Sequence, residues 1–344
     1  MPSTMKDIAE AAGVSQPAVS AVLNNRRNCR VSAETRKRIL SIAHALNYHP
    51  NQAARLLKGK KSNTIAIFTG RNISSLQNET LKQLSYKLLE HKLNCFTVPA
   101  RDNDDLRERY QALLAHNIDA LICFFIDFDF DRSMFKLPQV HVGVEMRNTP
   151  DIVEALREGG EIIAAHLLEH GHLNYVFLTD KLSSNFPKYA GVCNVFEKSD
   201  KKPSLEVFEF FHNETIVPEI LRAVASGVTA FICTNDYIGS RLCKVLQQHN
   251  IRVPEDVVVT GFDGMAFTEY TTPSITTVRC VPEELAGATV ELLLARMKNP
   301  AFPASLRIPV HFHCGESCGC KTGQNNNFFF ETMPAVITPQ AKQE

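Results

Sequence analysis

Two short helical patterns at the N-terminus constrain the fold of this 344-residue chain more than any other feature. They meet at Gly13, and glycine readily takes the positive φ that a tight turn between helices needs. Thr4 and Ser15 precede the two patterns as expected N-caps, and Asp7, three residues after Thr4, approximates a capping box. The layout predicts a helix-turn-helix whose small core is shared by Ile8, Ala9, Ala12, Val14, Val19 and Val22.

A third helix is expected to close over these two. Ser32 stands as its N-cap, and apolar side chains recur at helical spacing over residues 33–46, at Ile39, Ile42, Ala43 and Leu46. Pro50 ends the pattern, because a proline disfavours helix in the residue before it.

Charge is unevenly distributed along a chain whose formal net charge is zero. Residues 1–61 hold eleven Lys or Arg and three acidic residues, a net charge of +8, so the rest of the chain carries −8. A basic unit on an acidic body favours a polyanionic partner for that unit alone. Because the second helix of a helix-turn-helix enters the DNA major groove, double-stranded DNA is the expected partner.

Residues 51–59 form a short, basic, helix-prone segment. Asn51 is a capping residue and Gly59 a terminating one, but so few residues make a marginal helix unless something else orders it. The adjacent Leu56 and Leu57 have two explanations that the residues leave open. They pack onto the next domain, or they form an apolar wedge between base steps in the minor groove.

From Thr64 onward the pattern changes to alternating strands and helices. Strands are expected at 64–70, 95–98, 120–126, 140–144, 174–178, 205–211, 230–233 and 257–260, with helices at 75–92, 104–117, 161–170, 217–226 and 238–248. Such alternation is typical of doubly wound parallel sheets, and over about 260 residues it predicts two subdomains with a cleft between them.

Composition argues against several classes of protein. The chain is 44% hydrophobic and 22% charged, which is ordinary for a globular protein, and no apolar run approaches the ~20 residues of a membrane span. No apolar signal segment opens the chain and the ten cysteines are scattered, so a reducing cytoplasm is the expected location. No nucleophile motif or glycine-rich nucleotide loop stands out, so we expect neither an enzyme nor a bound cofactor.

Several motifs resemble LacI-family transcription regulators. In the N-terminal unit these are Asp7-Ile-Ala-Glu-Ala-Ala-Gly-Val-Ser15, Ala18-Val-Ser-Ala-Val-Leu-Asn24 and Leu46-Asn-Tyr-His-Pro-Asn-Gln-Ala-Ala-Arg-Leu-Leu57. In the body, residues 234–236, 250–263 and 272–278 resemble the family's effector-binding core. The resemblance implies a regulator, a repressor above all, that binds a palindromic operator as a homodimer and responds to a small, sugar-like molecule.

The implied architecture is an α/β body of two Rossmann-like lobes, similar to periplasmic binding proteins, behind a small all-α helix-turn-helix domain and a hinge helix. The helix-turn-helix domain is expected at 1–50, the hinge helix and linker at 51–61, the body at 62–322 and a polar tail at 323–344. The N-lobe would span roughly 62–160 plus 279–309, and the C-lobe roughly 161–278 plus 310–322.

The resemblance also assigns DNA contacts. Gln16, Pro17 and Ala21 fall where the family reads base edges; Gln16 can pair bidentately with adenine, whereas Pro17 and Ala21 offer only apolar contact. The expected phosphate contacts are Thr4, Ser15, Ser20, Asn24 and Tyr48. In the hinge, Leu57 falls at the family's wedging leucine, and the DNA-binding set is completed by Asn51, Arg55 and Lys58.

The effector positions depart from the family pattern. Lys188 stands where arginine is usual, and a lysine lacks the planar fork that arginine offers to sugar hydroxyls. Asn235 and Asp263 match family effector contacts, and with Lys188, Arg71 and Glu158 they are the expected ligand-binding set for a polar or anionic ligand.

Two alternatives follow from this departure and from the body itself. The same DNA-binding regulator could have a degenerate cleft and act without a ligand, or answer to a protein partner. A soluble solute-binding protein would account for the body, but not for the basic N-terminal unit or for the absent signal segment.

The C-terminal part of the body is rich in potential metal ligands, at His311, His313, Cys314, Cys318 and Cys320. The spacing is chemically possible for a metal site. However, residues 316–319 fall where the family ends its last strand with a similar Ser-Cys, so we expect no metal and structural or exposed thiols instead.

Overall fold

The computed structural model describes residues 3–24, 31–48, 61–71, 73–144, 150–209, 216–303 and 305–320. They belong to two compact units, Met1–Ser62 and Asn63–Glu344. The expected hinge helix, apart from Lys61, and the polar tail lie outside the described residues. None of the described helices is long and apolar enough to cross a membrane.

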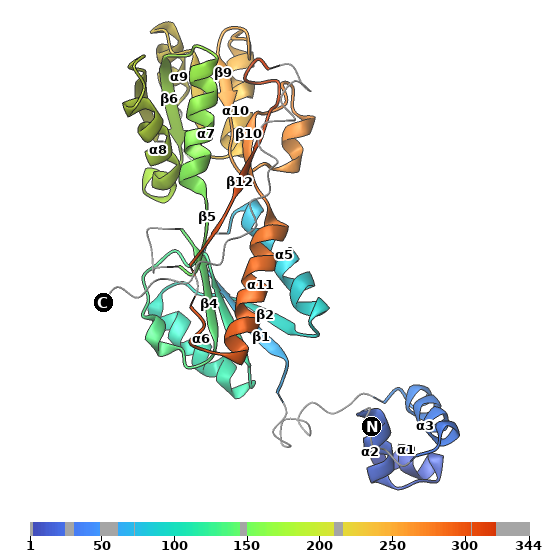
Figure 1. Ribbon diagram of the computed structural model, residues 1–344. Coiled ribbons are helices and arrows are strands. Elements are labelled where there is room, and N and C mark those ends of the chain that lie inside the picture. Colours follow the sequence, from blue (N-terminus) through green and yellow to red (C-terminus); the bar gives the residue numbers. More distant parts are fainter. Residues whose placement is uncertain are drawn as a thin grey trace. The chain divides into compact units, whose positions relative to one another are not determined.

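The first unit consists of α1 (Met5–Ala12), α2 (Gln16–Leu23) and α3 (Ala33–Ala45) (Figure 1). Its core holds Ile8, Val19 and Ile39, all fully buried. The three helices contact one another through the side chains that the sequence assigned to the core. Leu46 differs from that expectation, because it follows the end of α3 and remains 39% exposed.

Helix capping explains where α1 and α2 begin. Thr4 Oγ1 accepts a hydrogen bond from the Asp7 N–H at 3.3 Å and the Thr4 N–H donates to Asp7 Oδ2 at 2.7 Å, which confirms the capping box. Gly13 ends α1 with φ of 62°, as the turn requires. Ser15 is the N-cap residue of α2 as expected, but the expected side-chain bond is absent: its side chain makes no capping hydrogen bond, and its carbonyl accepts from the first turn.

The N-lobe of the second unit contains a six-stranded parallel sheet in the order β11-β5-β4-β3-β1-β2. Its strands are β1 (Thr64–Thr69), β2 (Asn94–Pro99), β3 (Ala120–Phe124), β4 (Gln139–Gly143), β5 (Ile152–Glu154) and β11 (Leu306–Ile308). Helices α5 (Ser75–Glu90) and α11 (Pro282–Lys298) pack on one face, and α6 (Asn103–Ala115) and the 3-10 helix η1 (Arg132–Met134) on the other. The central strands are buried on both faces, which explains their nearly continuous apolar sequences.

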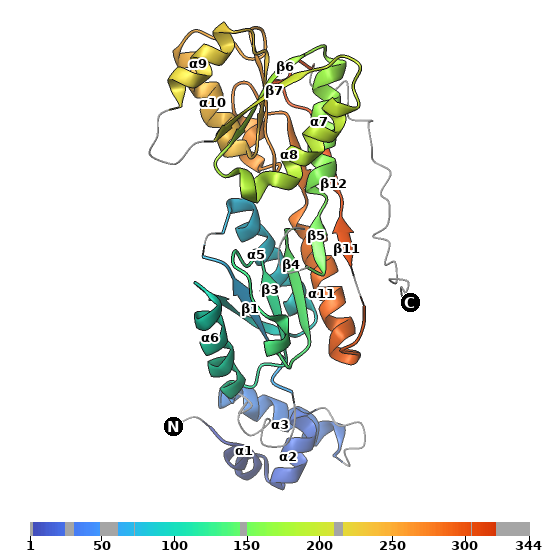
Figure 2. The ribbon, with the colours of Figure 1, turned by 90° about the vertical axis from the view of Figure 1, so that its left-hand side faces the viewer.

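The C-lobe contains a four-stranded parallel sheet in the order β7-β6-β8-β9. Its strands are β6 (Asn174–Thr179), β7 (Ser204–Glu209), β8 (Ala230–Cys233) and β9 (Val258–Thr260). Figure 2 shows α7 (Leu156–Glu169) and α8 (Leu182–Glu197) on one face, and α9 (Val217–Ala225) and α10 (Asp236–Gln248) on the other. The 3-10 helix η2 (Ala266–Tyr270) follows β9.

Three chain segments connect the lobes, near β5 and the antiparallel pair of β10 (Thr277–Cys280) and β12 (Val310–His313) (Figure 1). A buried ion pair holds the first segment at its start. The Asp151 carboxylate, just before β5, accepts from both terminal nitrogens of Arg296 on α11 at 2.6 and 2.9 Å and from Arg132 at 2.8 Å. These bidentate, charge-assisted bonds fix β5 against the N-lobe.

Glycines let α7 and α8 approach each other closely. A Cβ atom on Gly191 of α8 would overlap the Arg157 carbonyl of α7, and one on Gly160 of α7 would overlap the Lys188 carbonyl of α8. Because backbone atoms cannot yield as a flexible side chain can, only glycine fits at these two positions.

Gly191→Ala is therefore expected to lower the free energy of unfolding by about 2 kcal/mol or more, because the two helices must separate. Gly287→Ala is the matched control. Gly287 lies inside α11, where a Cβ would meet nothing within 4 Å, so alanine should raise stability by up to about 1 kcal/mol. Urea unfolding measures the free energy of unfolding of both variants. An equal change in the two variants would contradict the close approach of α7 and α8.

Candidate functional site

The exposed face of α2 carries the residues expected to read DNA. Val19 and Val22 are buried against the other helices, whereas Gln16 and Pro17 are exposed in the first turn and Ala21 is half-buried one turn later. Pro17 is tolerated there because the first N–H groups of a helix have no intrahelical partner. The structure thus brings the three residues expected to read bases onto one accessible surface.

The residues expected to contact phosphates differ in the hydrogen bonds that their side chains make within the protein. The Thr4 hydroxyl is engaged in the capping box, whereas the Ser15 hydroxyl makes no capping bond. Asn24 Nδ2 donates to the Ser20 carbonyl at 2.7 Å and faces the Ser20 hydroxyl at 3.4 Å, so these two side chains form one polar site after α2. Tyr48 is half-buried and burial raises its pKa, so its hydroxyl stays a donor. Asn51, Arg55, Leu57 and Lys58 lie outside the described residues.

A cavity of about 550 Å³ lies between the two lobes of the second unit. Four of the five residues expected to bind a ligand line it: Arg71 from the N-lobe, and Lys188, Asn235 and Asp263 from the C-lobe. Residues distant in the sequence therefore meet where the C-terminal ends of parallel strands face each other, which is the usual ligand position in open α/β sheets.

Lys188 forms the floor of this cavity and is 7% exposed. Its ammonium donates to the Thr234 carbonyl at 2.7 Å, lies 3.5 Å from Asp263 Oδ1 and stands 4.0 Å above the centre of the Phe262 ring. A buried ammonium needs such partners to offset its lost hydration. The lysine at this position thus binds neighbouring elements together as well as facing the cavity.

Asp263 and Asn235 are held in place by the backbone around them. Asp263 adopts φ of 102°, which is unusual for a residue other than glycine, and its N–H donates to the Val278 carbonyl at 2.8 Å. Asn235 Oδ1 accepts from the Ile238 N–H at 2.9 Å and so caps α10. The carboxamide nitrogen of Asn235 is the remaining polar group that can turn toward a ligand.

Glu158 does not line the cavity, so the structure separates it from the other four residues. It lies in the first turn of α7, where its carboxylate accepts a hydrogen bond from Arg307 of β11 at 3.1 Å and thus connects the two lobes. The glutamate that does line the cavity is Glu154, at the end of β5. A carboxylate at the C-terminal end of a strand is a recognisable signal, but sequence analysis did not identify β5.

Burial controls the charge of the cavity. It raises the pKa of Glu154 to about 7, with the Asp263 carboxylate adding to the effect. It also raises the pKa of Asp263, although the adjacent Lys188 ammonium opposes that shift. His141, stacked on Phe130 in the wall, has its pKa lowered by burial to about 3 and is neutral at pH 7.

Comparisons with known proteins agree with this architecture. A model of the lacI family of bacterial regulatory proteins matches residues 4–51, and a model of the periplasmic binding protein-like domain matches residues 164–318. The crystal structure of the Lac repressor dimer bound to operator and the anti-inducer ONPF has the same fold. Its TM-score is 0.79 and its identity 22%, covering 92% of this chain and 99% of that one.

Curated relatives match nearly the whole chain. The HTH-type transcriptional repressor PurR of Aliivibrio fischeri (strain MJ11) is 27% identical over 318 residues, which are 86% of this chain and 92% of the relative. The ribose operon repressor of Haemophilus influenzae is 29% identical over 312 residues, which are 87% and 93% of the two chains.

A helix-turn-helix unit joined to a two-lobed α/β body defines a class of DNA-binding transcription regulators. This chain belongs to the lacI family of that class. The fold class and the regulatory function predicted from the sequence are confirmed, and the named relatives are repressors.

The raised pKa of Glu154 predicts a pH-dependent stability. In the unfolded chain this carboxyl ionises near its ordinary value, whereas in the folded protein it stays protonated up to about pH 7, so its ionisation destabilises the fold as pH rises between these values. Wild type should therefore lose about 2 kcal/mol relative to Glu154→Gln between pH 5 and pH 8, measured by urea unfolding.

Glu158→Gln is the matched control for this experiment. It removes one partner of an exposed ion pair, so it should change stability by less than about 1 kcal/mol at either pH. If the free energy of unfolding of Glu154→Gln changes in parallel with that of wild type between pH 5 and pH 8, the Glu154 carboxyl does not have the raised pKa described here.

Proposed function

We propose that this regulator is a repressor that binds a palindromic operator as a homodimer and is modulated by a neutral, polyhydroxylated ligand, a sugar or sugar derivative, in the interlobe cavity. The observation that carries the proposal is the cavity itself, whose polar groups come from both lobes. A ligand that touches both lobes stabilises one of their arrangements over another, which is how a small molecule acts on a distant site.

The charges of the cavity favour a neutral ligand over an anion. Two of its three lysine and arginine side chains are already compensated, because Arg71 Nε lies 3.6 Å from Asp127 Oδ2 and Lys188 is paired with Asp263. Carboxylates are more numerous than cationic groups in the lining, which includes Asp127, Glu154, Asp180, Asp263, Arg71, Lys181 and Lys188. Closely alternating donors and acceptors suit hydroxyl groups, which both donate and accept.

The relatives' names support the same class of ligand. The similar proteins include repressors named for a ribose operon and a sucrose operon. The phenyl rings of Phe125 and Phe130 in the wall supply apolar surface against which a sugar ring can lie. The proposal accordingly narrows the expected polar or anionic ligand to a polar, neutral one and retains Arg71, Lys188, Asn235 and Asp263 as ligand-binding residues.

Operator recognition follows from the surface of α2. Gln16 supplies the hydrogen bonds to a base edge, and Pro17 and Ala21 supply apolar contacts such as those made to a thymine methyl group. Ser15, Ser20, Asn24, Thr4 and Tyr48 position the helix on phosphates. In this proposal the hinge residues Asn51, Arg55, Leu57 and Lys58 complete the interface, with Leu57 as the minor-groove wedge.

Exposed apolar side chains support a dimer of the body. Tyr86 and Leu89 on α5 are 55% and 62% exposed, and Phe96 on the edge strand β2 is 52% exposed. On the C-lobe, Tyr237 and Tyr270 are 53% and 83% exposed. Exposed large apolar side chains on both lobes are available to an interface between two copies of the body, and a twofold dimer presents two helix-turn-helix units to a palindrome.

A ligand screen tests the proposal. We expect the full chain to melt at a higher temperature with at least one neutral sugar from a panel that includes ribose and sucrose, because the ligand binds only the folded state. Arg71→Ala, which removes a cavity side chain, should weaken that ligand at least about tenfold by calorimetry.

Arg107→Ala is the matched control, because it too removes an arginine from an exposed ion pair of the N-lobe, with Asp104 on α6. It should leave ligand affinity unchanged. If no sugar shifts the melting temperature of a chain that still binds its selected operator, the cavity is not a sugar site and the ligand-independent alternative is correct.

A further inference from the structure

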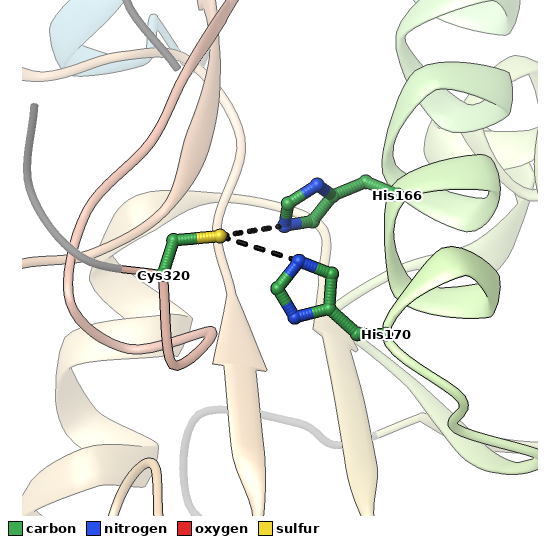
Figure 3. Close-up of side chains that lie close together, drawn as sticks. All are labelled: His166, His170 and Cys320. Atoms are coloured by element: carbon green, nitrogen blue, oxygen red, sulfur yellow. Dashed lines mark hydrogen bonds between the residues drawn. The ribbon is translucent and has the colours of Figure 1, made fainter. Parts of the chain in front are cut away.

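A cluster of nitrogen and sulfur donors lies on the C-lobe, apart from the residues that line the cavity. His166 lies on α7 and His170, one turn later, is the C-cap residue of that helix. Figure 3 shows both rings pointing at the Cys320 side chain, in the segment that follows β12. Cys320 Sγ lies 3.7 Å from His166 Nε2 and 3.3 Å from His170 Nε2. These distances join residues that are 154 and 150 positions apart in the sequence.

Two more thiols complete the cluster. The sulfur atoms of Cys314, Cys318 and Cys320 all lie within 4.8 Å of one another, and all three cysteines are free. Cys318 is 1% exposed and is the most buried of the three, and Cys320 belongs to both groups of ligand atoms, so it joins the thiols to the two histidines.

The two separations between Cys320 and the histidines fit one tetrahedral metal ion. Zinc binds sulfur at about 2.3 Å and imidazole nitrogen at about 2.0–2.1 Å, so a tetrahedral angle places the two ligand atoms about 3.6 Å apart. The two sulfur–nitrogen distances, 3.3 and 3.7 Å, lie on either side of that value. Thiolate and imidazole together select zinc-like ions over magnesium or calcium, which prefer oxygen ligands.

We propose that this cluster is a zinc site in which His166 Nε2, His170 Nε2, Cys320 Sγ and Cys318 Sγ hold one Zn²⁺. The proposal is independent of the sugar site and departs from the expectation that no metal binds. It also differs from the set suggested by spacing alone. His311 faces Glu284 at 3.4 Å instead, and His313 lies on β12, outside the cluster.

A metal ion here would attach the segment 314–320 to α7. That segment is also hydrogen-bonded to the rest of the C-lobe. The Ser317 N–H donates to the Ser274 carbonyl, and the Ser317 hydroxyl donates to the Val259 carbonyl of β9. Zinc coordinates the thiolate forms of Cys318 and Cys320 and the neutral imidazole rings through Nε2. Protons compete with the metal ion for these four atoms, so affinity falls as pH is lowered.

The test uses the untagged full chain, freed of metal with a chelator and then titrated with Zn²⁺ against a chromophoric competitor. We expect one Zn²⁺ per chain, a higher melting temperature with zinc, and a thiolate charge-transfer band when Co²⁺ replaces Zn²⁺. His170→Asn, at an exposed position where folding is not at risk, and Cys320→Ser should each weaken zinc at least about a hundredfold.

His313→Asn and Cys193→Ser are the matched controls, since both residues belong to the body but lie outside the cluster, and both should bind zinc as wild type does. Cys318→Ser and Cys314→Ser distinguish the fourth ligand, and only the former should weaken binding. If wild type takes up no zinc at equimolar micromolar concentration, or if His170→Asn binds as tightly as wild type, the cluster is only a set of thiol–imidazole hydrogen bonds.

Discussion

The cavity depends on the interactions of one buried group, the ammonium of Lys188. It joins the end of β8, through the Thr234 carbonyl, to Asp263 after β9, and it lies over the Phe262 ring. The Lys188 carbonyl in turn fits against Gly160 of α7, so the helix crossing that seats α8 also sets the depth of the ammonium. The same contacts therefore pack the C-lobe and form the floor of the cavity. The Lys188 ammonium is largely excluded from water, and it keeps its position because Thr234, Asp263 and Phe262 interact with it.

Local patterns predicted the helix-turn-helix well. Gly13, the capping pair Thr4 and Asp7 and the apolar spacing act over a few residues, so they can be recognised without knowledge of the tertiary fold. Ser15 shows the limit of such patterns, because it occupies the N-cap position but its side chain makes no capping hydrogen bond. The pattern determines which residue precedes a helix; the rotamer of the side chain depends on the surroundings.

The cavity and the histidine–cysteine cluster were harder to predict because they depend on long-range packing. The three-residue strand β5 and helix α8, which contains Pro187, have weak local signals, and so Glu154 was missed in favour of Glu158. In the cluster, the sequence put all candidate ligands near the C-terminus. The fold instead brings α7 beside Cys320, a relation that no spacing within residues 311–320 could show.

The central claim is that occupation of the cavity and binding of DNA are coupled through the two-lobed body. The most direct measurement is the dissociation constant of the operator, selected from random DNA by the full chain, with and without the saturating sugar, together with that of the sugar with and without the operator. The sugar changes the dissociation constant of the operator by one factor, and the operator changes that of the sugar by another. Thermodynamic linkage requires these two factors to be equal, and we predict a common factor of about 5–150. Identical operator affinity in the presence and absence of a sugar that binds the cavity would contradict the claim.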